Sequence, residues 1–171
     1  MNEKDRKPQN GSMEYQGAPL REINGRNTKL LDPVLLQREE DNLNYMMHLE
    51  NRFLLLNFNL EAGRDTFSDM PEGIHKGWEF PTCQLRGHFL GHWLSAAAMH
   101  YQETGDEQIR AKADAIVAEL AECQKENGGR WVGPIPEKYL YRIAAGKQVW
   151  APHYTIHKVF MGLLDMYSLA G

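Results

Sequence analysis

The chain has little of what several common classes of protein require. It has two cysteines in 171 residues, Cys83 and Cys123, which are too few for a disulfide framework or a cysteine-rich metal motif. Its net charge of -4 shows no excess of Lys and Arg, and nucleic-acid binding needs clustered basic residues. No apolar run reaches the roughly 20 residues of a membrane span. We therefore expect no nucleic-acid partner, no membrane span and two ordinary thiols.

The N-terminal region offers little to bury. Residues 1–8 have no apolar core behind them, so no secretion signal is recognised and a cytoplasmic location is expected. A secreted or periplasmic location is expected instead if the true start lies further upstream. Residues 1–28 are polar and rich in Asn, Gly, Lys and Glu, which predicts a flexible tail. Residues 29–171 are then the folded domain.

Helical periodicity dominates the remainder, and no stretch alternates with period two for long enough to make a strand. Asp32 followed by Pro33 predicts a helix start, because aspartate is a good N-cap and proline fits the first helical position. The dense apolar pattern over residues 34–60 predicts one or two helices ending near Gly63. Glycines, prolines and short polar residues over 63–81 predict a long irregular connection.

Three further helices are predicted, so the fold class is all-α. Apolar residues at helical spacing over 85–97 predict the first, which we expect to end at Gly105. Thr104 and Glu107 stand at capping-box spacing ahead of the second. The third covers residues 156–167, where apolar residues recur at every expected position.

An internal repeat favours helical hairpins. Tyr101 and Gly105 close one apolar helix, and Tyr167 and Gly171 close another, each landmark being displaced by 66 residues. Two histidines four residues apart precede both pairs. A repeat of this size is typical of a helical hairpin with its loop, stacked around a ring.

The densest group of chemically active side chains lies over residues 77–93. Gly87 and Gly91 are four residues apart, as are His88 and His92. Each glycine costs a helix up to about 1 kcal/mol relative to alanine, which indicates that a close neighbour needs the space. Together with Gln84 and Arg86, the histidines suit a polyhydroxylated or anionic ligand. The alternative is that the glycines permit tight helix packing and the histidines are satisfied core groups.

A second group lies over residues 149–158. Trp150 and Tyr154 precede or begin the predicted helix, together with His153, His157 and Lys158. Aromatic faces cover the C–H faces of a sugar, and imidazoles hydrogen-bond its hydroxyls. The alternative is a loop whose aromatic side chains pack under a neighbouring helix.

The spacing of the histidines also requires that metal binding be considered. The pairs His88/His92 and His153/His157 each have the i, i+4 spacing that can chelate zinc, and Glu79 would complete a set. Neither pair carries the glutamate that follows the first histidine in metalloprotease helices. We therefore predict no metal site in this chain.

Three strings together resemble a known family: NRFLLLNFNLEAG, GWEFPTCQLRGHFLGHWLSAAAMHYQETGD and VWAPHYTIHKVFMGLLDMYSLAG. From about Pro19 to Gly171, the chain is similar to the N-terminal part of the β-L-arabinofuranosidase family of glycoside hydrolases. The resemblance implies the N-terminal part of an (α/α)6 toroid, truncated within the ring. It implies a carbohydrate partner, a plant glycan containing β-linked L-arabinofuranose. It also implies that complete members bind zinc, with a zinc-bound cysteine as nucleophile and a glutamate as acid/base.

The resemblance also implies roles for individual residues. His157 and His153 match histidines near the sugar subsite. Glu79, Arg86 and His88 match the loop-and-helix signature that borders the same cavity. With Trp150, taken from the local pattern, these are the predicted substrate-binding residues.

No catalytic residue and no metal ligand is predicted in this chain. In the family, the catalytic glutamate, the nucleophile and the zinc ligands lie downstream of the matching region, and Cys83 and Cys123 do not match them. The leading hypothesis is a glycosidase fragment, inactive alone. The missing hairpins would expose apolar helix faces and make the isolated chain unstable or prone to aggregate. The alternatives are a non-catalytic sugar-binding module and a small helical interaction protein without a ligand.

Overall fold

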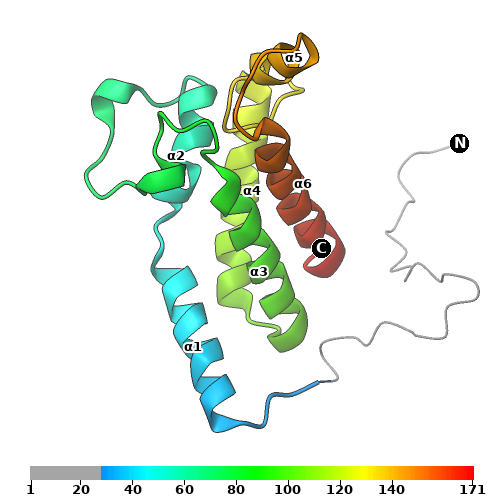
Figure 1. Ribbon diagram of the computed structural model, residues 1–171. Helices are drawn as coiled ribbons and strands as arrows, with labels where there is room; N and C mark the ends of the chain where they lie inside the picture. Colours follow the sequence, from blue (N-terminus) through cyan, green and yellow to red (C-terminus); the bar gives the residue numbers. More distant parts are fainter. Residues whose placement is uncertain (1–27) are drawn as a thin grey trace, which may run out of the picture.

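The computed structural model describes residues 28–171, so the predicted tail, residues 1–28, lies outside the described residues except for Thr28 (Figure 1). The described part is helical and contains no strand, which confirms the all-α prediction. None of its helices is long and apolar enough to cross a membrane. The α-helices are α1 (Pro33–His48), α2 (Asn51–Glu61), α3 (His88–Thr104), α4 (Glu107–Glu126), α5 (Lys138–Ala144) and α6 (Pro152–Leu169). The short 3-10 helices are η3 (Phe67–Asp69) and η4 (Gly77–Glu79).

The first apolar stretch forms two helices rather than one. The side chain of Asp32 accepts hydrogen bonds from the backbone N–H groups of Val34 and Leu35, which confirms the predicted N-cap. The chain turns between α1 and α2, and the amine of Lys112 on α4 donates to the carbonyls of Met47 and Leu49 there. This lysine satisfies carbonyls at the end of α1 that have no partner within the helix.

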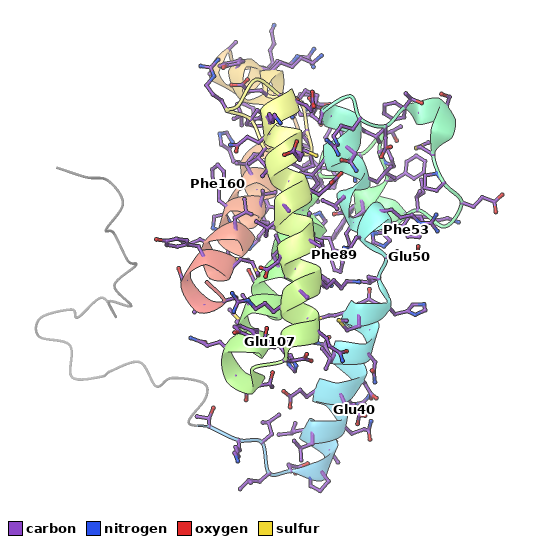
Figure 2. The ribbon with its side chains drawn as sticks, turned by 180° about the vertical axis from the view of Figure 1, so that it is seen from behind. Glu40, Glu50, Phe53, Phe89, Glu107 and Phe160 are labelled. Atoms are coloured by element: carbon purple, nitrogen blue, oxygen red, sulfur yellow. The ribbon has the colours of Figure 1, made fainter. Side chains whose placement is uncertain are left out.

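The connection between α2 and α3 is irregular, as predicted, but it is anchored by aromatic contacts. The ring of His75 lies 6.2 Å from Phe53 of α2 and 6.2 Å from Phe89 of α3. Both phenylalanines are labelled in Figure 2. The connection also contains η3 and η4, and it brings Glu79 toward the start of α3. The loop is therefore part of the packed domain.

Two predicted details at the ends of α3 are wrong. Gly87 is not inside the helix: it precedes α3 with a φ of 79°, a conformation that glycine adopts without strain. The proposed capping box is absent because Thr104 is still helical, and its hydroxyl donates to the carbonyl of His100. The N-cap of α4 is Asp106, which accepts from the backbone N–H of Gln108 at 2.8 Å. Gly105 ends α3 as predicted.

The core is centred on α3, which packs against both α4 and α6. Figure 1 shows α3 in front of α4 and beside α6. The α3 and α6 helices run side by side in the same direction and approach backbone to backbone. A Cβ atom placed on Gly91 would lie 2.0 Å from the carbonyl oxygen of Lys158, and one on Gly162 would lie 2.4 Å from the carbonyl oxygen of Gly91. The tight-packing interpretation is therefore confirmed for Gly91.

The C-terminal part contains one element that the sequence pattern did not predict. The seven-residue helix α5 lies in a stretch where the sequence pattern predicts no helix. The last helix begins at Pro152, four residues before the predicted start at Ile156. Its first proline fits this position because the missing N–H would have no helical partner there.

Candidate functional site

Five rings gather where the N-terminal ends of α3 and α6 meet, and they are called here the aromatic cluster. The ring centroids of Trp78 and Trp150 are 6.4 Å apart, and Trp78 lies 6.3 Å from His88. Tyr154 lies 5.8 Å from His88 and 6.5 Å from His92. The structure thus joins the two groups over residues 77–93 and 149–158 into one site. The aromatic cluster consists of Trp78, His88, His92, Trp150 and Tyr154.

Hydrogen bonds between the two segments hold the aromatic cluster in place. The backbone N–H of Trp150 donates to the side-chain oxygen of Gln84 at 2.7 Å. The hydroxyl of Thr155, which is fully buried, donates to the carbonyl of Leu85 at 3.2 Å. These bonds link residues 66 and 70 positions apart, so no local sequence signal marks them. Thr155 is a positioning residue that sequence reasoning missed, and the side-chain oxygen of Gln84, which the sequence pattern places among the ligand-binding groups, accepts from the backbone of Trp150 instead.

The aromatic members of the cluster face solvent. Trp78 is 62% exposed, Trp150 is 51% exposed and Tyr154 is 43% exposed. Large aromatic rings are ordinarily buried, and exposed groups of them mark binding surfaces. Rings with an apolar face beside polar edge groups are suited to a ligand that has both C–H faces and hydroxyls.

His92 supplies an uncharged polar group at the centre of the aromatic cluster. Burial lowers the pKa of His92 below its ordinary value of 6.5, and the nearby Lys158, His88 and His157 lower it further. Its Nε2 lies 3.3 Å from the hydroxyl of Tyr154, so the two groups share a hydrogen bond. The Nζ of Lys158 lies 5.1 Å from the centre of the Tyr154 ring. The lowered pKa therefore favours the neutral form of His92 within the aromatic cluster.

Glu79 and Arg86 lie behind this surface. The Glu79 carboxylate accepts from the backbone N–H groups of Gly87 and Phe89 and contacts Nδ1 of His88. The guanidinium of Arg86 is buried, donates to the carbonyl of Cys83 and lies 3.7 Å from the carboxylate of Glu61. Burial raises the pKa of Glu61, and the charge of Arg86 opposes that rise. A direct sugar contact for Glu79 or Arg86 stays a prediction.

The remaining predicted residues lie beside a second surface feature. His153 and His157, both exposed on α6, line an open hollow of about 470 Å³ between α5 and α6. His157 is also close enough to His92 to lower its pKa. Of the predicted site residues, the structure therefore brings His88 and Trp150 into the aromatic cluster and places His153 and His157 along an adjoining apolar hollow. Its lining residues are Leu140, His153, Ile156, His157, Phe160, Met161 and Leu164.

A metal ion would need a group of ligating side chains close together. Within residues 28–171, no three His, Cys, Asp or Glu side chains are grouped so that they could hold a metal ion. Burial raises the pKa of the Cys123 thiol to about 11, and this thiol donates to the side-chain oxygen of Asn59 at 3.1 Å. A thiol held in its protonated form is a poor nucleophile and a poor metal ligand. The residues that the structure describes do not fit the zinc site that the family resemblance implies for complete members.

The helices α3 and α6 are parallel neighbours, α4 packs on α3, and the aromatic cluster lies at the N-terminal ends of α3 and α6. A family model described as the catalytic domain of β-L-arabinofuranosidases of glycoside hydrolase family 127 matches residues 27–171. The chain belongs to this family, and its helices form part of an (α/α)6 toroid. Comparisons with curated proteins and with solved structures give no match.

Proposed function

We propose that this chain supplies a sugar-binding wall in a glycosidase domain that acts on plant glycans containing β-L-arabinofuranose. Membership of the family supports a carbohydrate substrate. The observation that carries the proposal is the meeting of three exposed aromatic rings with two imidazoles at the N-terminal ends of α3 and α6. In this account, Trp78 and Trp150 cover the apolar face of the sugar.

The polar groups of the same surface orient the ligand. His88, His92 and the hydroxyl of Tyr154 lie among the rings, where they can hydrogen-bond sugar hydroxyls. His153 and His157 extend the surface along α6 toward the apolar hollow and receive the next part of the glycan. Few polar groups on a largely apolar surface are typical of small-ligand sites.

We also propose that the chain does not cleave glycosides by itself. The resemblance assigns the nucleophilic role to a cysteine thiolate, whereas the thiol of Cys123 is buried with a pKa raised to about 11. Hydrolysis of 4-nitrophenyl β-L-arabinofuranoside, assayed with added zinc and a reductant, should stay at the uncatalysed rate. Release of nitrophenol that disappears in Cys83→Ala or Cys123→Ala would show that the chain carries its own nucleophile.

Binding is tested with methyl β-L-arabinofuranoside and saturation-transfer nuclear magnetic resonance. Transfer from protein to sugar protons is expected, and Trp150→Ala should weaken binding about tenfold because one stacking face is lost. The matched control is Tyr141→Ala, which removes an aromatic ring that is 65% exposed on α5, outside the aromatic cluster. Absence of transfer contradicts the proposal. Equal binding of methyl β-D-glucopyranoside would contradict specificity for β-L-arabinofuranoside and favour a general sugar-binding module.

A further inference from the structure

The carboxylate of Glu79 caps α3 from eight residues upstream. Gly87, the residue before the helix, has no side chain with which to cap it. Instead, Oε2 of Glu79 accepts from the N–H of Gly87 at 2.7 Å, and Oε1 accepts from the N–H of Phe89 at 3.0 Å. The side chain of Asn57 on α2 donates to the backbone carbonyl of Glu79 at 2.8 Å, which fixes this turn. The carboxylate of Glu79 is thus held by two backbone N–H groups, and its backbone carbonyl is held by the side chain of Asn57.

The same carboxylate determines which nitrogen of His88 carries the proton. Nδ1 of His88 lies 2.6 Å from Oε1 of Glu79 and 3.2 Å from the carbonyl oxygen of Leu85. A carboxylate and a carbonyl only accept hydrogen bonds, so Nδ1 must be the N–H donor. In the neutral ring, Nε2 then carries a lone pair and acts as an acceptor. Within residues 28–171, no hydrogen bond is made to Nε2.

The surroundings of His88 show which part of the molecule Nε2 faces. Its side chain is 12% exposed and that of Glu79 is 14% exposed, so the pair is largely shielded from water. The rings of Trp78, His92 and Tyr154 lie 5.8 to 6.3 Å from the ring of His88. The free edge of the imidazole therefore belongs to the aromatic cluster, while the other edge is fixed by Glu79.

We propose that Glu79 is a positioning residue that fixes the orientation and the tautomer of His88, so that Nε2 of His88 accepts a hydrogen bond from a sugar hydroxyl. The acceptor role toward a sugar rests on the proposed function, whereas the positioning role does not. In other proteins a carboxylate orients a ligand-binding histidine in the same way. It fixes one ring nitrogen as a donor and leaves the other nitrogen for the ligand.

The first test measures the tautomer of His88 directly. Long-range proton–nitrogen correlation spectra above pH 7 should show a protonated Nδ1 and an unprotonated Nε2 in the unaltered protein. In Glu79→Gln, which keeps the size of the side chain but can also donate, His88 should become a mixture of tautomers. A protonated Nε2 in the unaltered protein, or an unchanged His88 signature in Glu79→Gln, would overturn the positioning role.

A matched control separates this effect from loss of a helix cap. Asp32→Ala removes a carboxylate that also accepts from two backbone N–H groups, at the start of α1. It should lower stability, because the cap is lost, while leaving the His88 signature unchanged. A change of the His88 tautomer in Asp32→Ala would show that general destabilisation causes it, and would overturn the inference.

Sugar affinity then tests the acceptor role. Glu79→Gln should weaken binding of methyl β-L-arabinofuranoside about tenfold, as expected for one misdirected hydrogen bond in a shielded site. Unchanged affinity would overturn the acceptor role. Absence of binding by the unaltered protein would overturn the proposed function together with the acceptor role, while the tautomer measurement decides the role of Glu79 separately.

Discussion

The neighbouring helices α3 and α6 have similar apolar character, but they differ in how far their apolar side chains are buried. Leu94 and Ala98 of α3 are 1% and 0% exposed, because α4 and α6 cover that helix. Phe160 and Leu164 of α6, which lie 66 residues further along, are 59% and 62% exposed. Figure 2 shows Phe160 on the side of α6 away from α4. Apolar spacing therefore specifies that a helix has a face to bury, but not which element covers it.

The internal repeat of 66 residues relates the buried face of α3 to the exposed face of α6. Gly91 and Leu94 form the part of α3 on which α6 packs, since a Cβ atom on Gly162 would meet both residues. A shift of 66 residues takes them to His157 and Phe160, which line the open hollow. The open face of α6 thus corresponds to the face of α3 that receives a neighbouring helix. Among the helices within residues 28–171, only α5 packs on α6 besides α3 to more than a minor extent.

The largest loss of stability is expected at the contact between α3 and α6. Gly91→Val should lower the free energy of unfolding by about 3 kcal/mol or more, because the added atoms meet the backbone of Lys158 and neither helix can yield locally. Chemical denaturation measures the change. Gly128→Ala is the control: no atom lies within 4 Å of its added Cβ, so only the cost of its φ of 78° remains, about 1 kcal/mol. Equal costs for the two variants would contradict this packing.

The same substitution on both helices tests the difference in burial. Leu94→Ala should destabilise the protein by about 2 to 5 kcal/mol through lost burial and a cavity. Leu164→Ala should cost about 0.5 kcal/mol or less, because that side chain already contacts water. Denaturation of the two variants under identical conditions gives the comparison. A similar cost at both positions would mean that the α6 face is covered in solution.

The open face should also govern how the chain behaves in solution. Exposed apolar side chains on α6 predict self-association and a tendency to aggregate. Phe160→Glu combined with Leu164→Glu should shift sedimentation velocity profiles toward the monomer. Tyr141→Glu, an exposed residue of α5, should not do so. A monodisperse unaltered monomer with a cooperative thermal melt would refute the prediction.

The smallest predicted effect is the contribution of His92, at the N-terminal end of the α3–α6 pair, to the pH dependence of stability. Because the folded state lowers the pKa of His92, the unfolded chain binds the proton more readily. The associated stability is fully present above pH 6.5 and is lost as the pH falls below that value. His92→Gln should flatten the dependence of the unfolding free energy on pH between about 8 and 5. Parallel curves for the two proteins would exclude this contribution.

Much of the fold follows from local patterns. The cap at Asp32, the termination at Gly105 and the spacing of the apolar residues were sufficient to predict the long helices. The helix α5 was missed because it spans only seven residues, which is too short for a periodic pattern to be distinctive. The capping box failed because Thr104 and Asp106 both fit the local rule, and only the real end of α3 decides between them.

The candidate site was only partly predictable for a different reason. The residue types at His88 and Trp150 indicated a polar and aromatic surface, and both lie in the aromatic cluster. The part played by Glu79 depends on a turn that returns it to the start of α3, and no fixed spacing encodes that turn. Gln84 and Thr155 act through bonds between distant segments, which become visible only when α3 and α6 are side by side.

The most direct test of the sugar-binding surface uses the indole signals of the four tryptophans. Trp93 and Trp131 are internal controls, because their N–H groups already donate to the carbonyls of Met46 and Ile135. On titration with methyl β-L-arabinofuranoside, the indole resonances of Trp78 and Trp150 should shift together while those of Trp93 and Trp131 stay in place. If no indole resonance shifts, or if only Trp93 and Trp131 respond, the aromatic cluster is not the sugar-binding surface.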